Sequence, residues 1–226
     1  MNNKLFLILI LFCLLGWGCL KPYPQFYHDE TNGFDVTTSP LYEIPDGEPK
    51  VINSNFANIE NDDITMFEDG FIRLGYSSFN AKHYGEHGAI SQAKKVHASV
   101  VIIYSRYINT ASGSVPITTP NDQSATYWIK IKDSAVRLGV HIIDLTPEAR
   151  QATGSNKGML ILAVLKNSPA FHADIINGDI LRRVGENEIY DLDSYLDALG
   201  KYAGTETQVV VWRKGNEIKK SIKLNP

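Results

Sequence analysis

The hydrophobic and polar positions of this chain form two patterned blocks. In the first, residues 71–76 predict a strand with a break at Gly75, and residues 85–98 carry small and apolar residues at the spacing of one helix face. Residues 98–105 are a β-branched run, which predicts a strand buried on both faces. A strand, a helix and a strand at this spacing predict a small βαβ unit with parallel pairing.

The second block lies toward the C-terminus and begins with a strand pattern at residues 127–132. Further strands are expected at residues 139–144, 159–165, 180–184, 208–213 and 218–224. Helices are expected at residues 147–152, 170–173 and 192–199. Together the two blocks predict the α+β fold class, with a small βαβ-containing domain followed by a second domain.

The segments between the blocks set the expected domain limits. Residues 19–61 contain five prolines and no convincing strand or helix period, which predicts a tether with an irregular entry into the first domain. An α+β domain of unknown function is expected over residues 62–108. Residues 109–126 are rich in Thr, Ser, Pro and Asn and predict a linker, so the second domain is expected to cover residues 127–226.

The first residues have the pattern of an export signal. Lys4 precedes an apolar run of eleven residues, 5–15, which is shorter than the ~20 residues of a transmembrane helix and suits the core of a signal peptide. The string GWGC at residues 16–19 follows at once. It resembles the cleavage motif of bacterial lipoproteins, although Gly16 stands where leucine is usual.

The lipoprotein resemblance implies that residues 1–18 are removed as a signal peptide and that Cys19 carries acyl chains such as palmitate. Two or three acyl chains anchor a protein durably in a membrane. The expected location is the cell envelope, and in a double-membraned bacterium the periplasmic side of the outer membrane, because Leu20 follows the cysteine instead of aspartate. An ordinary secretory signal, or an uncleaved anchor with an incidental cysteine, is the alternative.

Composition narrows the classes of function. The chain has 22 Lys and Arg against 25 Asp and Glu, a net charge of −3, so it lacks the basic surplus of a nucleic-acid binder. Both cysteines, Cys13 and Cys19, fall in the signal region. A disulfide framework, a cysteine zinc cluster and a cysteine nucleophile are therefore excluded from the folded part.

Three motifs follow one another in the second block. The first, RLGV at residues 137–140, is an apolar-glycine-apolar turn that leads into a strand. The second, GMLILAV at 158–164, runs to NSPA at 167–170. The third, ADIINGDIL at 173–181, precedes VGENEI at 184–189. Over about 90 residues, this order resembles the PDZ domains of HtrA-like proteases.

The PDZ resemblance implies a partly open β-barrel or sandwich with two helices. A protein C-terminus or an extended segment would add as a strand beside residues 139–143, with its carboxylate bound by backbone N–H groups of the turn. The helix at 192–199 would form the opposite wall. The candidate peptide-binding residues are Arg137, Leu138, Gly139, Val140, His141, Ile142, Leu192, Tyr195, Leu196 and Leu199. The alternative is core packing for the helix residues and a solvated surface position for Arg137.

Enzyme activity is not expected. Asp179 follows Gly178 in a pattern that predicts a turn capping backbone groups, not a catalytic acid. A serine protease would need a Gly-x-Ser-Gly-Gly-like turn and far more chain before Leu138 than is present.

One pair of histidines has the spacing of metal ligands. His83 and His87 are four residues apart, so they would share a face of a helix. Gly85 and Gly88 disfavour a helix there, which favours a polar turn. The sequence therefore predicts neither a metal nor a cofactor.

The combined prediction is a membrane-anchored envelope lipoprotein whose PDZ domain binds protein C-termini or extended segments as a non-catalytic adaptor or scaffold. Its expected partners are those peptides and, through the lipid, the membrane, with no nucleic acid. Two alternatives remain open. One is an accessory that regulates a separate envelope protease, and the other is a PDZ groove that is occupied internally and serves only to pack domains.

Overall fold

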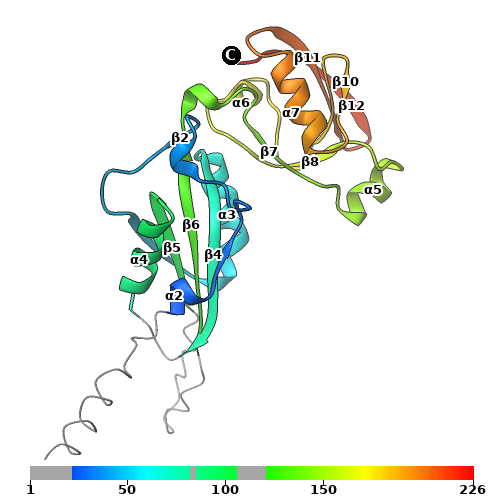
Figure 1. Cartoon of the computed structure of the whole chain (residues 1–226). Coiled ribbons are helices and arrows are strands. Elements are labelled where there is room, and N and C mark those ends of the chain that lie inside the picture. The colour runs from blue at the N-terminus through cyan, green and yellow to red at the C-terminus, as the bar shows by residue number, and fades with distance from the viewer. Residues whose placement is uncertain (1–21, 82–84, 106–120) are drawn as a thin grey trace, which may run out of the picture.

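The computed structural model describes residues 22–81, 85–105 and 121–226, which fold into two units, each built on one sheet (Figure 1). The first unit precedes the 3₁₀ helix η3 (Asp133–Ala135), and the second follows it. Within the described ranges, no helix is long and apolar enough to cross a membrane. Cys19 and the predicted signal peptide lie outside the described residues.

The first sheet has the strand order β1-β4-β6-β5-β3, and β2 pairs with the end of β6. Its strands are β1 (Tyr27–Asp29), β2 (Tyr42–Glu43), β3 (Lys50–Ser54), β4 (Phe71–Ala81), β5 (Val100–Ser105) and β6 (Asn121–Ile131). The helices are α2 (Pro22–Gln25), α3 (Ile59–Glu68) and α4 (His87–Lys95), with 3₁₀ turns η1 (Val36–Thr38) and η2 (Phe56–Asn58).

Both faces of this sheet are covered, with α4 and α3 on opposite sides (Figure 1). Val101 and Ile103 of β5 pack in the core that includes Ala89 and Ala93 of α4. The alternate residues of β5 pack in the core that includes Met66 of α3. The predicted burial of this strand on both faces is therefore confirmed.

The predicted βαβ unit is present with a different pairing. Strands β4 and β5, joined through α4, run in the same direction, but β6 lies between them and is antiparallel to both. The direct parallel partner of β5 is β3. The expectation of direct pairing was wrong because β3 and β6 are the neighbours of β5. The expected tether contains β3, and β6 is divided between the expected linker and the expected second domain.

Two expected boundaries are corrected by these strands. The expected tether at 19–61 contains Tyr23, which is fully buried, and strands β1 to β3 of the first sheet. The expected linker at 109–126 ends inside β6, and residues 127–131, assigned by sequence to the second domain, complete that strand. The first half of β6 was not predicted as a strand because it is rich in polar residues. Ser124 is buried there, and its hydroxyl donates to the Ser77 carbonyl oxygen (3.0 Å), so its hydrogen bond is satisfied.

The second sheet has the order β12-β11-β9-β8-β7, with β10 beside β9, and every pairing is antiparallel. Its strands are β7 (Val140–Ile143), β8 (Met159–Val164), β9 (Ile180–Val184), β10 (Asn187–Glu188), β11 (Glu206–Arg213) and β12 (Asn216–Lys223). Its helices are α5 (Pro147–Thr153), α6 (Pro169–His172) and α7 (Leu192–Lys201). Each strand predicted from 139 onward and each predicted helix of this block is present, so the fold class is confirmed.

Local capping explains why these helices begin where they do. Ser168 accepts a hydrogen bond from the Phe171 N–H (3.2 Å) and starts α6, with proline at the first helical position. Asp191 and Ser194 form a reciprocal capping box at the start of α7. Each of these signals is readable in a few consecutive residues.

Asp179 has the structural role that the sequence predicts. Its carboxylate is fully buried and accepts a hydrogen bond from the Ile176 N–H (3.1 Å) across the turn. The Arg213 guanidinium donates to both of its oxygens, at 2.6 and 2.7 Å. A buried carboxylate is stable when its charge is paired in this bidentate way.

Candidate peptide-binding groove

Strand β7 forms one edge of the second sheet. Among the described residues it pairs only with β8, so the backbone groups along its other edge have no strand beside them. The carbonyl oxygens of Leu138 and Gly139 accept from the N–H groups of Ala170 (3.0 Å) and Leu165 (2.9 Å) and fix the turn before β7. An unpaired strand edge next to a fixed turn can accept an extended peptide as a further strand.

Glycine is the only residue type that fits at position 139 of this turn. Its φ is +84°, and a Cβ built on it would lie 2.1 Å from the Ser168 Cβ. The same Ser168 hydroxyl donates to the Gly139 carbonyl oxygen (3.3 Å) while it caps α6. The glycine of the first motif and the serine of the second therefore occur together because they touch.

Helix α7 lies opposite and presents two kinds of residue. Tyr195 and Leu199 are buried in the domain core, and burial raises the pKa of the Tyr195 phenol above its usual range. Leu192 and Leu196 remain 53% and 52% exposed. Core packing therefore accounts for the first pair, and the second pair leaves apolar surface open beside the groove.

An apolar cavity of about 250 Å³ lies at the start of β7, between this strand and α7. Among its lining residues are eight of the predicted positions: Arg137, Leu138, Gly139, Val140, His141, Tyr195, Leu196 and Leu199. Ile142 and Leu192 are outside this lining. Arg137 is an exposed residue, so its guanidinium is available to an approaching carboxylate.

The same cavity has a second wall that the sequence did not predict. It consists of residues of the first unit and the connection: Phe67, Gly70, Phe71, Ile72, Ile131, Ala135 and Val136. Phe67 to Ile72 lie at least 120 positions before α7 in the chain, and the other three precede the turn at Gly139. Nothing local in the sequence marks a long-range contact of this kind.

The two units meet where the end of α3 packs against the end of β8. The rings of Phe67 and His141 stack with centroids 3.7 Å apart and planes 12° apart. The Lys166 N–H donates to the Glu68 carbonyl oxygen (2.9 Å), and the Lys166 ammonium pairs with Asp69 (2.6 Å). This combination of stacking, backbone and charged contacts joins α3 to the PDZ-like unit beside the groove.

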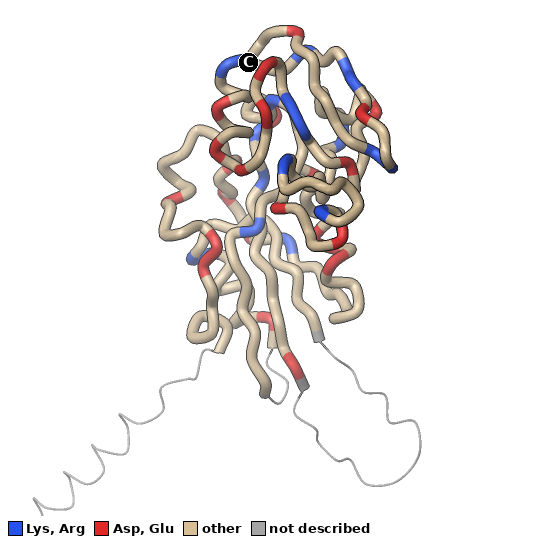
Figure 2. The backbone as a smooth tube through the Cα atoms, turned by 90° about the vertical axis from the view of Figure 1, so that its right-hand side faces the viewer, with Lys and Arg blue, Asp and Glu red and all other residues tan. Residues whose placement is uncertain are grey.

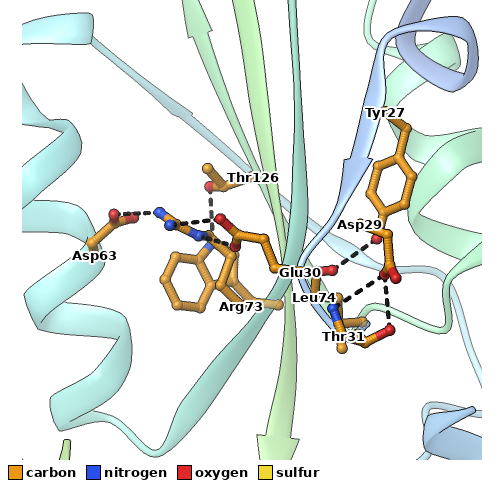
Figure 3. Close-up of polar contacts among 9 residues, drawn as sticks. Tyr27, Asp29, Glu30, Thr31, Asp63, Arg73, Leu74 and Thr126 are labelled. Carbon is orange, nitrogen blue, oxygen red and sulfur yellow. Dashed lines mark hydrogen bonds and ion pairs between the residues drawn. The ribbon is translucent and has the colours of Figure 1, made fainter. Parts of the chain in front are cut away.

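Helix α3 is in turn held on the first sheet by Arg73 of β4 (Figure 3). The Arg73 guanidinium donates to Asp63 of α3 (2.6 Å) and to both carboxylate oxygens of Glu30 (2.6 and 3.0 Å). It also lies over the Trp128 ring, 5.9 Å from the centroid. The Arg73 cation therefore fixes the helix that carries Phe67 into the cavity wall.

Burial, and secondarily the Arg73 cation, lower the pKa of His141 from about 6.5 to about 4. Between about pH 4 and pH 6.5, the His141 imidazole is therefore neutral in the folded chain and protonated in the unfolded chain. The stability that depends on neutral His141 is fully present above pH 6.5, falls as the pH drops from 6.5 to about 4, and is constant below that.

Thermal unfolding of the full chain between pH 7 and pH 4 measures this dependence. We expect a loss of at most ~3 kcal/mol from His141, since one pKa unit corresponds to ~1.4 kcal/mol. His141→Phe keeps a ring for stacking and cannot be protonated, so its profile should be flatter by that amount. Parallel profiles for the two proteins would contradict the assignment.

A second, polar hollow of about 520 Å³ lies along the same seam. Lys166 pairs there with Asp69, and the Lys130 ammonium donates to the Asp69 carbonyl oxygen. Both lysines that line this hollow are therefore already bonded to Asp69. The apolar cavity beside β7 is the better candidate for a ligand.

The predicted histidine pair cannot be placed, because His83 lies outside the described residues. Within the described part of the chain, no three His, Cys, Asp or Glu side chains gather in a way that could hold a metal ion. Lys, Arg, Asp and Glu are interspersed over both units (Figure 2).

Comparison with known proteins agrees with the geometry. Residues 136–224 match the family model of the PDZ domain. The second unit is therefore a PDZ domain, as the motifs predict. No curated protein matches the chain.

Several solved structures are similar to parts of the chain. The HtrA3 PDZ domain bound to a phage-derived ligand (FGRWV) is 22% identical, with a TM-score of 0.35 over 39% of this chain and 83% of that chain. The HtrA-type protease AlgW with decapeptide is 17% identical, with a TM-score of 0.36 over 69% of this chain and 49% of that chain. AlgW with tripeptide is 19% identical, with a TM-score of 0.36 over 44% and 39%. The chain thus spans less than half the length of both AlgW chains.

Proposed function

We propose that the PDZ domain captures protein C-termini or extended segments and that the chain acts as a non-catalytic adaptor or scaffold in the cell envelope. The observation that carries this proposal is the unpaired edge of β7, which faces the half-exposed Leu196 across an apolar cavity. Main-chain hydrogen bonds to such an edge supply affinity, and the cavity supplies specificity for a side chain.

The chemistry of the groove favours a free carboxyl terminus over an internal segment. The cavity is at the start of β7, where the last residue of an antiparallel ligand strand would lie. The turn at Leu138 to Val140 and the exposed Arg137 are there to meet a carboxylate. Leu138 and Leu196 would surround an apolar terminal side chain.

A groove-blocking substitution tests this proposal. Leu196→Arg places a charge in the apolar cavity and should weaken binding of C-terminal peptides to the full chain about tenfold or more, because an unpaired charge is costly to desolvate. Fluorescence anisotropy with a panel of labelled decapeptides that have free carboxylates measures it.

Ile176→Arg is the matched control. Ile176 is 47% exposed and precedes β9 outside the cavity lining, so the charge there should leave peptide affinity unchanged. If the wild-type chain, Leu196→Arg and Ile176→Arg all bind the peptides with equal affinity, the peptides bind outside the groove. If the wild-type chain binds no peptide of the panel, the groove serves only to pack the two domains together.

The envelope location rests on the N-terminal pattern. We propose that Cys19 becomes the first residue of the mature protein and carries the acyl chains that tether it, on the periplasmic side of the outer membrane in a double-membraned bacterium. Mass analysis of the mature N-terminal peptide tests this. An acylated Cys19 supports the tether, and an unmodified cysteine or an uncut chain contradicts it.

A further inference from the structure

The alternation of side chains along β7 determines which residue of a ligand strand faces which side. Val140 and Ile142 pack against the PDZ core, and His141 between them points to the opposite face. In an antiparallel pair, residues directly opposite each other share a face. A terminal residue that enters the cavity on the Val140 side therefore places the preceding, penultimate side chain on the His141 face.

The first domain occupies that face. Phe67 stacks on His141 and also lines the cavity together with Leu196 of α7. Its ring also packs edge-to-face against Trp128, at 5.3 Å between centroids and 75° between planes. The Phe67 ring is thus fixed between the two domains, is only partly buried, and lines the cavity.

The position of Phe67 is determined before any ligand arrives. Asp63, one helical turn earlier in α3, is bound by Arg73, and Glu68 and Asp69 directly after Phe67 contact Lys166 of the PDZ domain. A side chain held at both ends in this way loses little conformational freedom when it contacts a ligand.

From these contacts we infer that the peptide site is shared between the two domains, with Phe67 and His141 contacting the penultimate side chain of a bound C-terminus. The preferred ligand is a protein terminus with an aromatic penultimate residue and an apolar last residue. This inference rests on the proposed function, since it assigns the specificity of the same groove.

Three labelled decapeptides with free carboxylates, ending in Trp-Leu, Ala-Leu and Asp-Leu, test the inference on the full chain. We expect the Trp-Leu peptide to bind about tenfold more tightly than the Ala-Leu peptide, because one aromatic contact contributes on this scale. Phe67→Ala should bring the Trp-Leu peptide to the affinity of the Ala-Leu peptide, and leave the Ala-Leu peptide within about twofold of its wild-type value.

Two further variants separate recognition from general disturbance. Phe67→Tyr keeps the ring and should retain the preference for Trp-Leu. Phe34→Ala removes an aromatic ring that is 51% exposed elsewhere in the first domain and should change nothing.

The outcomes are distinct for the inference and for the proposed function. If Phe67→Ala keeps the tenfold preference, or weakens all three peptides equally, the shared site is overturned while peptide binding stands. If the wild-type chain binds none of the three peptides, the proposed function fails and the inference with it.

Discussion

Gly139→Ala is expected to destabilise the PDZ domain by ~2–5 kcal/mol and to abolish peptide capture. A left-handed backbone costs a non-glycine residue ~1–2 kcal/mol, and overpacking a fitted site typically costs ~1–3 kcal/mol more. The second cost arises because the new Cβ would lie 2.1 Å from the Ser168 Cβ. Relieving that overlap moves either the turn before β7, where we propose that the ligand carboxylate binds, or the start of α6. Chemical denaturation and peptide anisotropy measure the two effects.

Gly178→Ala separates the two causes. Gly178 has nearly the same φ, +86°, and nothing lies within 4 Å of a Cβ built there. It should therefore show only the backbone cost, with peptide binding retained. If both variants are equally stable and both bind peptide, the contact between Gly139 and Ser168 does not organise the turn.

The second large effect is expected at Asp179. Asp179→Ala removes the acceptor of the Ile176 N–H and two hydrogen bonds of Arg213, which keeps its bond to the Asp174 carbonyl oxygen. Because the Arg213 side chain is 24% exposed, we expect the ~1–3 kcal/mol cost of an unsatisfied buried group and not the cost of a buried unpaired charge. Denaturation of the full chain should show an earlier transition assigned to the PDZ domain, and hydrogen exchange should locate the loss at the end of β11 and the turn before β9.

A surface pair provides the comparison for this prediction. Lys157 and Glu188 approach to 2.6 Å, but their side chains are 65% and 59% exposed. Solvent screens such a pair, so Glu188→Gln should leave the unfolding midpoint of the PDZ domain unchanged. An Asp179→Ala protein as stable as Glu188→Gln would show that the buried pair contributes nothing to the fold.

The PDZ domain was predictable because its determinants are local. Gly139 indicates the turn before β7, and Ser168 indicates the cap of α6. Asp191 and Ser194 indicate the start of α7, and Asp179 indicates the turn before β9. Each requires only a few neighbouring residues to be recognised. The spacing of these signals then determined the order of strands and helices.

The first domain was only partly predictable, for physical reasons. The strong apolar run of β5 predicts a strand from its own sequence. In contrast, β3 and the first half of β6 lack a clear strand pattern, and they form strands because they pair with neighbouring strands of the sheet. Two buried polar residues of β6 are acceptable there because their hydroxyl groups are hydrogen-bonded: Ser124 donates to the Ser77 carbonyl oxygen across the sheet, and Thr126 accepts from the Trp128 indole N–H within the strand. Composition alone makes the same residues resemble a linker.

The second wall of the groove was not predictable at all from the sequence. Phe67 lies in a helix that the sequence did not identify, and its contact with His141 joins residues 74 positions apart. Likewise, helical spacing could not say that Tyr195 faces the core while Leu196 faces the groove. Both facts depend on how complete elements pack.

Hydrogen exchange along β7 tests the central claim most directly. The full chain is compared with and without a decapeptide that ends in Trp-Leu with a free carboxylate. If the peptide adds as a strand, amides of residues 138–142 should exchange more slowly, while those of β12, the opposite edge of the sheet, should not change. Bound peptide with unchanged exchange along β7, or with protection at β12 instead, would contradict the account.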